Sequence, residues 1–192
     1  MMIRNIRSFI NYFTLAASIS VTANAFASNL TADEQKAVEG LEAKGITAFY
    51  LLNEKEARLK QIKDGEVTLS VPVISGRNVG DTIETNPETT PAGIFEMRAF
   101  LNGEDIQYFR VGTNAYLIHE AGPIRQKLLK RWGTIPSKEF RVSSGCLNIA
   151  PEDFRRIYNQ VALSENTSFL FVMPEREMTL PQALNTFHLE NN

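Results

Sequence analysis

The chain has 192 residues, of which 43% are hydrophobic and 22% are charged, and its formal net charge at pH 7 is −2. This length suits a single domain. The mildly acidic balance excludes the basic footprint of a nucleic-acid-binding domain and the polybasic cluster that holds a protein on an anionic membrane.

The first 27 residues have the composition of an export signal. Arg4 and Arg7 form a positive start, residues 9–21 are mainly apolar, and alanines near the end of the segment fit a signal peptidase site. An uncleaved membrane anchor is disfavoured because polar residues interrupt the apolar run. Cleavage after Ala27 removes two arginines and no acidic residue, leaving 165 of the 192 residues with a charge of −4 instead of −2. We therefore expect a periplasmic or secreted protein with no stable membrane insertion after cleavage.

A short helix is expected in the N-terminal segment, residues 28–45. Thr31 is followed three residues later by Glu34, the capping-box pattern, and apolar residues then recur at helical spacing until Gly45. From residue 46 onward, short apolar or alternating runs indicate strands. Because Asp64-Gly65 is a strong hairpin signal, three successive antiparallel strands are predicted, at residues 48–52, 57–62 and 67–74.

The strand pattern continues on both sides of a long loop, residues 75–93, which is rich in glycine and proline. Loops of this length in a compact domain are usually functional or disordered. The remaining predicted elements are strands at 94–101, 106–111, 115–119 and 168–173, a hairpin turn at Asn102-Gly103, and helices at 124–132 and about 151–161. Residues 174–192 form a tail that adds a short helix after Thr179 or stays loosely ordered. The pattern predicts one mainly β domain with peripheral helices.

Cys146 is the only cysteine, and it follows the small residues Ser143, Ser144 and Gly145. A lone thiol forms no intrachain disulfide, and an idle thiol in an exported protein is open to oxidation, so a nucleophile is the favoured interpretation. A thiol is mostly protonated at neutral pH and needs a base. His119 ends an apolar run and is the obvious base, because the other histidine lies in the tail.

The neighbours of Cys146 supply the other parts of an acyl-transfer site. Ser143 can orient the His119 ring through its hydroxyl or its carbonyl. Gly145 permits a tight turn, so the main-chain N–H groups around Gly145 and Cys146, that of Ser144 included, can face a developing oxyanion. Taken alone, a single cysteine is more often a buried apolar residue, and one cysteine with two distant histidines does not give a metal-ligand set.

Four motifs in order resemble the L,D-transpeptidases with a YkuD-type catalytic domain, over residues 46–173. They are Val71-Pro72-Val73-Ile74-Ser75-Gly76, Thr90-Pro91-Ala92-Gly93-Ile94-Phe95, Tyr116-Leu117-Ile118-His119 and Ser143-x-Gly145-Cys146-Leu147-Asn148. The resemblance implies a YkuD-like β-sandwich or half-barrel catalytic domain that needs no metal or organic cofactor.

The resemblance also implies acyl transfer on the stem peptides of bacterial peptidoglycan. Cys146 would attack the third residue of a tetrapeptide, expel the terminal D-alanine and hold the acyl group as a thioester until an amine resolves it. His119 would carry the proton, and Tyr116 and Asn148 would contact the substrate. Water as the acceptor gives the alternative, an L,D-carboxypeptidase or amidase. A noncatalytic wall-binding module is a further alternative.

The chain departs from the family pattern in three places. Ser144 stands where the family usually has histidine, and Glu120 stands where a glycine usually follows the base. The segment between the expected base and nucleophile is longer than in many members. Together with loop 76–93, it is expected to form the walls of the groove that binds the donor peptide. The loss of a possible contact at Ser144 is expected to alter rate or substrate range.

Overall fold

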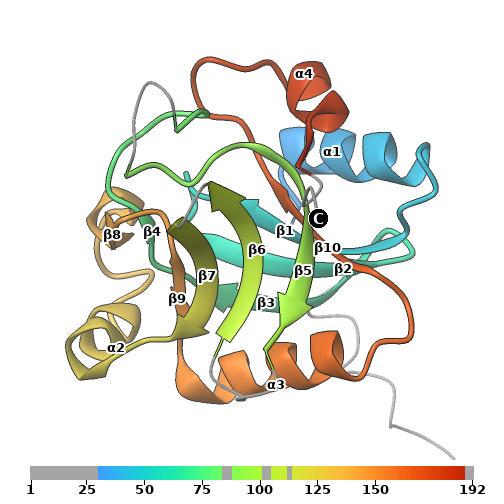
Figure 1. The fold of residues 1–192 in the computed structure, drawn as a ribbon. Helices are drawn as coiled ribbons and strands as arrows, with labels where there is room; N and C mark the ends of the chain where they lie inside the picture. Colours follow the sequence, from blue (N-terminus) through green and yellow to red (C-terminus); the bar gives the residue numbers. More distant parts are fainter. Residues whose placement is uncertain (1–29, 84–87, 101–104, 112–113, 189–192) are drawn as a thin grey trace, which may run out of the picture.

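A computed structural model describes residues 30–83, 88–100, 105–111 and 114–188 (Figure 1). The predicted export signal and the predicted turn at Asn102-Gly103 lie outside these residues. The helices are α1 (Ala32–Glu42), α2 (Pro123–Leu129), a 3-10 helix η1 (Ser137–Phe140), α3 (Pro151–Ala162) and α4 (Leu180–Asn185). The strands are β1 (Ala48–Asn53), β2 (Arg58–Lys63), β3 (Glu66–Pro72), β4 (Ser75–Gly76), β5 (Gly93–Ala99), β6 (Asp105–Val111), β7 (Asn114–Glu120), β8 (Arg141–Ser143), β9 (Leu147–Ile149), β10 (Ser168–Val172) and β11 (Phe187–His188).

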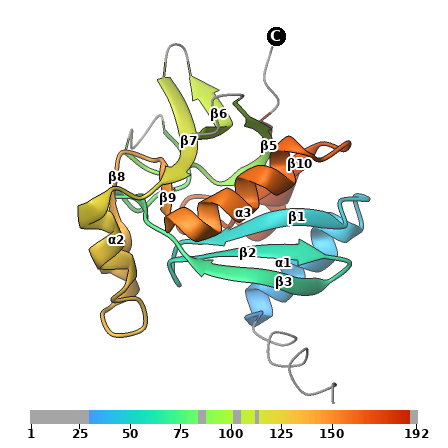
Figure 2. The ribbon, with the colours of Figure 1, turned by 90° about the horizontal axis from the view of Figure 1, so that it is seen from below.

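One large sheet forms most of the molecule. Its strand order is β3-β2-β1-β10-β5-β6-β7-β9, with β11 paired to β5 beside this path, and β4 pairs with β8 separately. The pairs β1–β10, β7–β9 and β11–β5 are parallel. The sheet bends into a nearly closed, barrel-like form, with α3 lying between β1–β3 and β5–β7 (Figure 2). The predicted fold class, mainly β with peripheral helices, is confirmed.

The central strand β1 is buried on both faces, which explains its run of apolar residues. Leu52 packs into the core beneath α3 together with Phe95 and Phe154. Leu51, its neighbour, packs into a second core with Phe171 on the opposite face. Successive strand residues point to opposite faces, so α3 covers one face while α1 and α4 cover the other (Figure 1).

The N-terminal helix begins at the predicted capping box. The N–H of Glu34 donates to Thr31 Oγ1 at 3.2 Å, and the N–H of Thr31 donates to Glu34 Oε2 at 2.7 Å. The same carboxylate is fully buried and accepts hydrogen bonds from Lys60 Nζ at 2.7 Å and from Asn53 Nδ2 at 3.1 Å. Glu34, the second residue of the capping box, therefore also fixes the helix to β1 and β2.

The first three strands form the predicted antiparallel meander. Asp64 and Gly65 have φ of 49° and 77°, which fits a two-residue hairpin turn with both central residues left-handed. The pairing then runs from Lys63 opposite Glu66 back toward Arg58 opposite Pro72. No helix in the part of the chain that the structure describes is long and apolar enough to cross a membrane.

The described part of the tail, residues 174–188, packs on the domain. Thr179 caps α4 through Gln182, and β11 then pairs with β5. The buried carboxylate of Asp81 accepts hydrogen bonds from the N–H groups of Glu175, Arg176 and Met178 at 2.6–2.8 Å. Loop 76–83 thereby holds the chain that leaves β10.

Candidate functional site

The register of two parallel strands brings the histidine next to the segment that follows the cysteine. β7 pairs with β9 so that Ile118 lies opposite Leu147 and His119 lies opposite Asn148. Ile118 and Leu147 are both fully buried. Because side chains alternate between faces and neighbouring strands are about 4.8 Å apart, His119 and Asn148 share the other face. Cys146 is the partly exposed residue just before β9, two positions before Asn148.

The imidazole of His119 is oriented by the main chain of the next residue. Nδ1 lies 3.0 Å from the carbonyl oxygen of Glu120. A carbonyl only accepts, so Nδ1 carries the proton in this arrangement, and Nε2 is left as the acceptor. The predicted orienting role of Ser143 therefore needs correction: the carbonyl of Glu120 makes the contact that the sequence analysis assigned to Ser143.

Ser143 instead closes the turn of residues 143–146, called the nucleophile turn below after the predicted role of Cys146. Its buried hydroxyl donates to the Cys146 carbonyl at 2.6 Å and accepts the N–H of Gly145 at 3.1 Å. Its own carbonyl accepts the N–H of Arg77 at 2.9 Å. One short polar side chain thus satisfies two main-chain groups of the turn. Since the N–H of Gly145 is used here, the predicted oxyanion donors narrow to the N–H groups of Ser144 and Cys146.

A glycine is required at position 145. Its φ is +101°, and a Cβ there would lie 2.3 Å from Tyr116 Cε1 and 2.8 Å from the Thr89 carbonyl oxygen. Both the left-handed backbone and the close approach exclude other residues. Ser144 beside it is exposed, with its hydroxyl 3.5 Å from Glu88 Oε1.

The carbonyl of Gly145 accepts hydrogen bonds from two hydroxyl groups. Tyr108 Oη donates to it at 2.8 Å and Thr90 Oγ1 at 3.2 Å. Thr90 Oγ1 also accepts the N–H of Gly76 at 3.0 Å. The Ser-Gly turn, the Thr-Pro segment and the nucleophile turn therefore meet at one hydroxyl. Tyr108 was not among the predicted site residues, because a tyrosine in an apolar strand has no distinguishing pattern.

A sequence match over most of the domain shows the family to which this chain belongs. Residues 48–168 match the sequence model of YkuD, described as the L,D-transpeptidase catalytic domain. This chain belongs to the YkuD family. Among curated proteins, none matches it.

Several solved structures have a similar fold. The helical cell shape determining protein Pgp2 from Campylobacter jejuni is 18% identical, with a TM-score of 0.45 over 72% of this chain and 52% of that one. An L,D-transpeptidase from Xylanimonas cellulosilytica is 14% identical, with a TM-score of 0.40 over 65% and 59%. L,D-transpeptidase 1 from Mycobacterium tuberculosis is 16% identical, with a TM-score of 0.39 over 66% and 61%. The chain thus spans little more than half the length of these structures, and the scores carry no argument about activity.

A buried carboxylate lies behind the nucleophile turn of this YkuD domain. Glu54 is fully buried, and neither of its oxygens has a hydrogen-bond partner among the described residues. Burial raises its pKa to about 8, although Arg141 Nη1, 3.6 Å from Oε1, opposes the shift, as do the nearby hydroxyls of Ser75 and Thr90. Arg141 also forms an ion pair with Glu175, whose pKa burial likewise raises.

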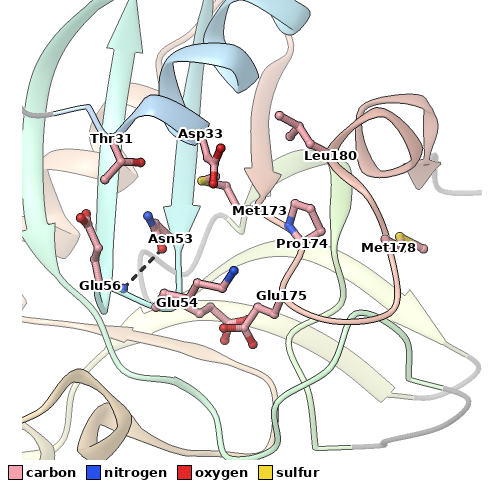
Figure 3. A pocket seen from close by; sticks show the side chains of 11 residues that line it. Thr31, Asp33, Asn53, Glu54, Glu56, Met173, Pro174, Glu175, Met178 and Leu180 are labelled. Atoms are coloured by element: carbon pink, nitrogen blue, oxygen red, sulfur yellow. Dashed lines mark hydrogen bonds between the residues drawn. The ribbon is translucent and has the colours of Figure 1, made fainter.

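Glu54 and Glu175 lie side by side on the floor of a pocket of about 470 Å³ (Figure 3). Glu54 also acts on Tyr108, whose pKa is raised well above its ordinary value by burial and, to a smaller extent, by Cys146 and Glu54. Tyr108 therefore stays a neutral hydroxyl that can donate to the Gly145 carbonyl.

Tyr116 and Asn148 both lie below the surface, which differs from their predicted contact with substrate. The Tyr116 ring is 8% exposed and packs against Gly145, and Asn148 is fully buried. The Asn148 Nδ2 group lies 3.4 Å from the Cys146 carbonyl, and Oδ1 accepts a 2.5 Å hydrogen bond from Arg125 Nη1. Asn148 therefore connects the main chain of Cys146 to α2, the helix of the segment between His119 and Cys146.

Among the described residues, no group of three or more acidic, histidine or cysteine side chains could hold a metal ion. The groups assembled at the site are a thiol, an oriented imidazole and main-chain donors. This set suits acyl transfer through a covalent thioester.

Proposed function

We propose that this chain is an exported peptidoglycan L,D-transpeptidase in which Cys146 is the nucleophile. Two observations support the proposal: the parallel register of β7 and β9, which pairs His119 with Asn148, two residues after Cys146, and the contact of His119 Nδ1 with the Glu120 carbonyl. A base with a fixed tautomer beside a partly exposed thiol is the arrangement that nucleophilic catalysis needs.

The reaction proceeds in two halves. His119 Nε2 takes the thiol proton as Sγ attacks the carbonyl of the third residue of a tetrapeptide stem. The N–H groups of Ser144 and Cys146 stabilise the oxyanion. The tetrahedral intermediate then collapses, the C–N bond breaks, and the imidazolium returns its proton to the departing D-alanine amine. A thioester remains until an acceptor amine attacks it, and this step restores the thiol.

The location and partner belong to the same proposal. An export signal on residues 1–27 would deliver the domain to the compartment that holds peptidoglycan, and the stem peptides would be its partners. The expected absence of stable membrane insertion follows from the polar residues in that segment.

Hydrolysis is a second candidate, with water as the acceptor. Ser144 and Glu88 place a hydroxyl and a carboxylate next to each other on the exposed side of the nucleophile turn, and such a pair can hold a water molecule. The net reaction would then be that of an L,D-carboxypeptidase or amidase.

Intact-mass spectrometry tests the proposal. Purified protein is incubated with tetrapeptide muropeptides or with a carbapenem, in parallel with the Cys146→Ala variant. We expect an acyl adduct on the unchanged protein and none on the variant. Well-folded protein that forms no adduct with either reagent would overturn the proposal. Analysis of the products separates the candidates: new crosslinks indicate transfer, whereas shortened monomers alone indicate hydrolysis.

A further inference from the structure

Arg125, in the first turn of α2, is a partly buried cation without an acidic partner. Its one hydrogen bond among the described residues is the 2.5 Å bond from Nη1 to Asn148 Oδ1. No carboxylate of the described part of the chain lies within ion-pairing distance of it. The acidic residue at the end of β7, Glu120, is paired with Arg155 at 3.6 Å instead.

The guanidinium lies close to the nucleophile. Asn148 is opposite His119 in the β7–β9 pair, and its Nδ2 group lies 3.4 Å from the Cys146 carbonyl. One amide side chain therefore separates Arg125 from the main chain of Cys146. Asn148 is itself fixed by two main-chain hydrogen bonds to Ile74, of 2.9 and 3.0 Å.

An unpaired guanidinium at this position is suited to a ligand carboxylate. Arginine has five N–H donors in a planar fork, and Asn148 uses one of them. Removing a cation from water without a counter-charge is costly. A carboxylate that accepted two parallel hydrogen bonds would supply both the charge and the acceptors.

We infer that Arg125 is a specificity-determining residue that binds a carboxylate of the donor peptide, an inference that rests on the proposed function. Asn148 holds the guanidinium in place for this contact. Two carboxylates of a stem peptide have the required chemistry: the terminal carboxylate of the leaving residue, and the side-chain carboxylate of a diamino diacid at the third position. Both lie within a few bonds of the attacked carbonyl.

The test compares three matched tetrapeptide donors. The first carries both carboxylates, the second has a terminal carboxamide, and the third has lysine in place of the diamino diacid. Acylation is followed for the unchanged protein and for Arg125→Gln, Arg125→Lys and Lys127→Gln. The last is a matched control, because Lys127 is an exposed cation on the same helix.

Arg125→Gln is expected to raise KM about ten- to a hundred-fold for the donor with both carboxylates, with kcat largely kept, since the lost contact is made equally in the ground and transition states. Arg125→Lys restores part of the affinity, and Lys127→Gln changes nothing. The donor that lacks the recognised carboxylate shows no difference between the unchanged protein and Arg125→Gln, and this identifies which carboxylate is bound. An equal penalty on all three donors, or no penalty on any, would overturn the inference.

Binding separates this inference from the proposed function. Donor affinity is measured by calorimetry in the Cys146→Ala background, with and without Arg125→Gln, and folding of each variant is confirmed by thermal unfolding. Donor binding that Arg125→Gln weakens at least tenfold supports the inference even if the unchanged protein forms no thioester. Tight binding that is indifferent to Arg125 contradicts the inference while leaving the thioester chemistry intact.

Discussion

Gly145 is the residue at which the geometry of the nucleophile turn is decided. Its N–H is bound by Ser143, and its carbonyl is bound by Thr90 and Tyr108. A turn with its main-chain groups fixed on both sides leaves the next residue, Cys146, few orientations. At this scale, the site depends on contacts that single-atom changes can remove.

Replacement of Gly145 with alanine is expected to destabilise the fold by about 3 kcal/mol and to abolish acylation. The new Cβ would be strained by its left-handed backbone and would overlap a main-chain oxygen and the Tyr116 ring. Gly133→Ala is the matched control, because Gly133 also has a positive φ, +80°, but has no atom within 4 Å of the added Cβ. Chemical denaturation of the two variants measures the difference, which should be about 2 kcal/mol. Equal losses would show that only backbone strain matters.

Tyr108→Phe tests whether the hydroxyl beneath the turn positions the nucleophile. The ring stays in the core, while the Gly145 carbonyl keeps only Thr90 as a donor. We expect the acylation rate to fall about five-fold and stability to fall by about 1 kcal/mol. Tyr50→Phe is the control, because it removes a hydroxyl that binds Gln160; it should lower stability and leave the acylation rate unchanged. Equal rate effects in the two variants would argue against a positioning role.

At the scale of elements, a buried ion pair joins α1 to the sheet beside the apolar packing of that helix. Glu34 and Lys60 are almost fully buried and 2.7 Å apart, and Lys60 is also paired with Glu56 at 3.1 Å. Removing one member of a buried pair leaves an uncompensated charge. The helix cap and the helix–sheet contact therefore depend on the same carboxylate.

Glu34→Gln is accordingly expected to lower the free energy of unfolding by about 3 kcal/mol. Asp33→Asn changes the neighbouring acidic residue of the same turn, which forms only an exposed pair with Lys36 at 3.4 Å; it should cost less than about 1 kcal/mol. Urea denaturation gives both values. A loss at Glu34 no larger than that at Asp33 would contradict the proposed role of the pair.

The longer elements were predictable because each carries a repeating pattern or a strong terminal signal. Thr31 and Glu34 indicated the start of α1, and Asp64-Gly65 indicated the first hairpin. The three-residue strands β8 and β9 were missed, since three residues are too few to show alternation. The sequence predicts a tight turn at Gly145 and then a helix from about residue 151, whereas the structure has β9 between Cys146 and α3. The sequence of the tail fits either a short helix or loose order, because the contacts that fix the tail depend on Asp81, nearly a hundred positions earlier.

Across the whole molecule, a buried charge network joins the end of β1, β8 and the tail behind the site. It comprises Glu54, Arg141 and Glu175. Three carboxylate oxygens of this network have no hydrogen-bond partner among the described residues. Such a network makes the stability of the entire fold sensitive to pH.

The sign of this pH dependence follows from Glu54. Its pKa rises from an ordinary 4.5 to about 8 on folding, so between these values the folded protein binds a proton that the unfolded chain has released. The contribution of Glu54 to stability is therefore greatest below about pH 4.5 and falls by about 1.4 kcal/mol per pH unit up to about pH 8.

Glu54→Gln, which mimics the protonated acid, should remove this slope. Its stability relative to the unchanged protein should rise steadily from pH 5 to pH 8, as measured by urea denaturation at each pH. Glu66→Gln, at an exposed strand position, is the control. Its free energy of unfolding should change with pH in the same way as that of the unchanged protein. Parallel curves for Glu54→Gln as well would show that Glu54 is already ionised in the fold.

The chemistry of the site was predictable to the extent that it rests on rare residue types. A single cysteine and a histidine at the end of an apolar run pointed to Cys146 and His119. The Glu120 carbonyl could not be found in this way, because every residue has one, and the contact of Arg125 with Asn148 depends on how α2 packs on β9. Contacts made by main-chain groups, and contacts between packed elements, can be identified only once the fold is known.

The acylation rate of Cys146 in the unchanged protein and in His119→Gln tests the central claim most directly. Folded protein is mixed with a tetrapeptide donor or a carbapenem at several pH values, and adduct formation is followed by mass spectrometry. If His119 takes the thiol proton, the variant should react at least about a hundred-fold more slowly at pH 7, and the gap should narrow at alkaline pH, where the solvent can take that proton. Equal rates at pH 7 would contradict the account.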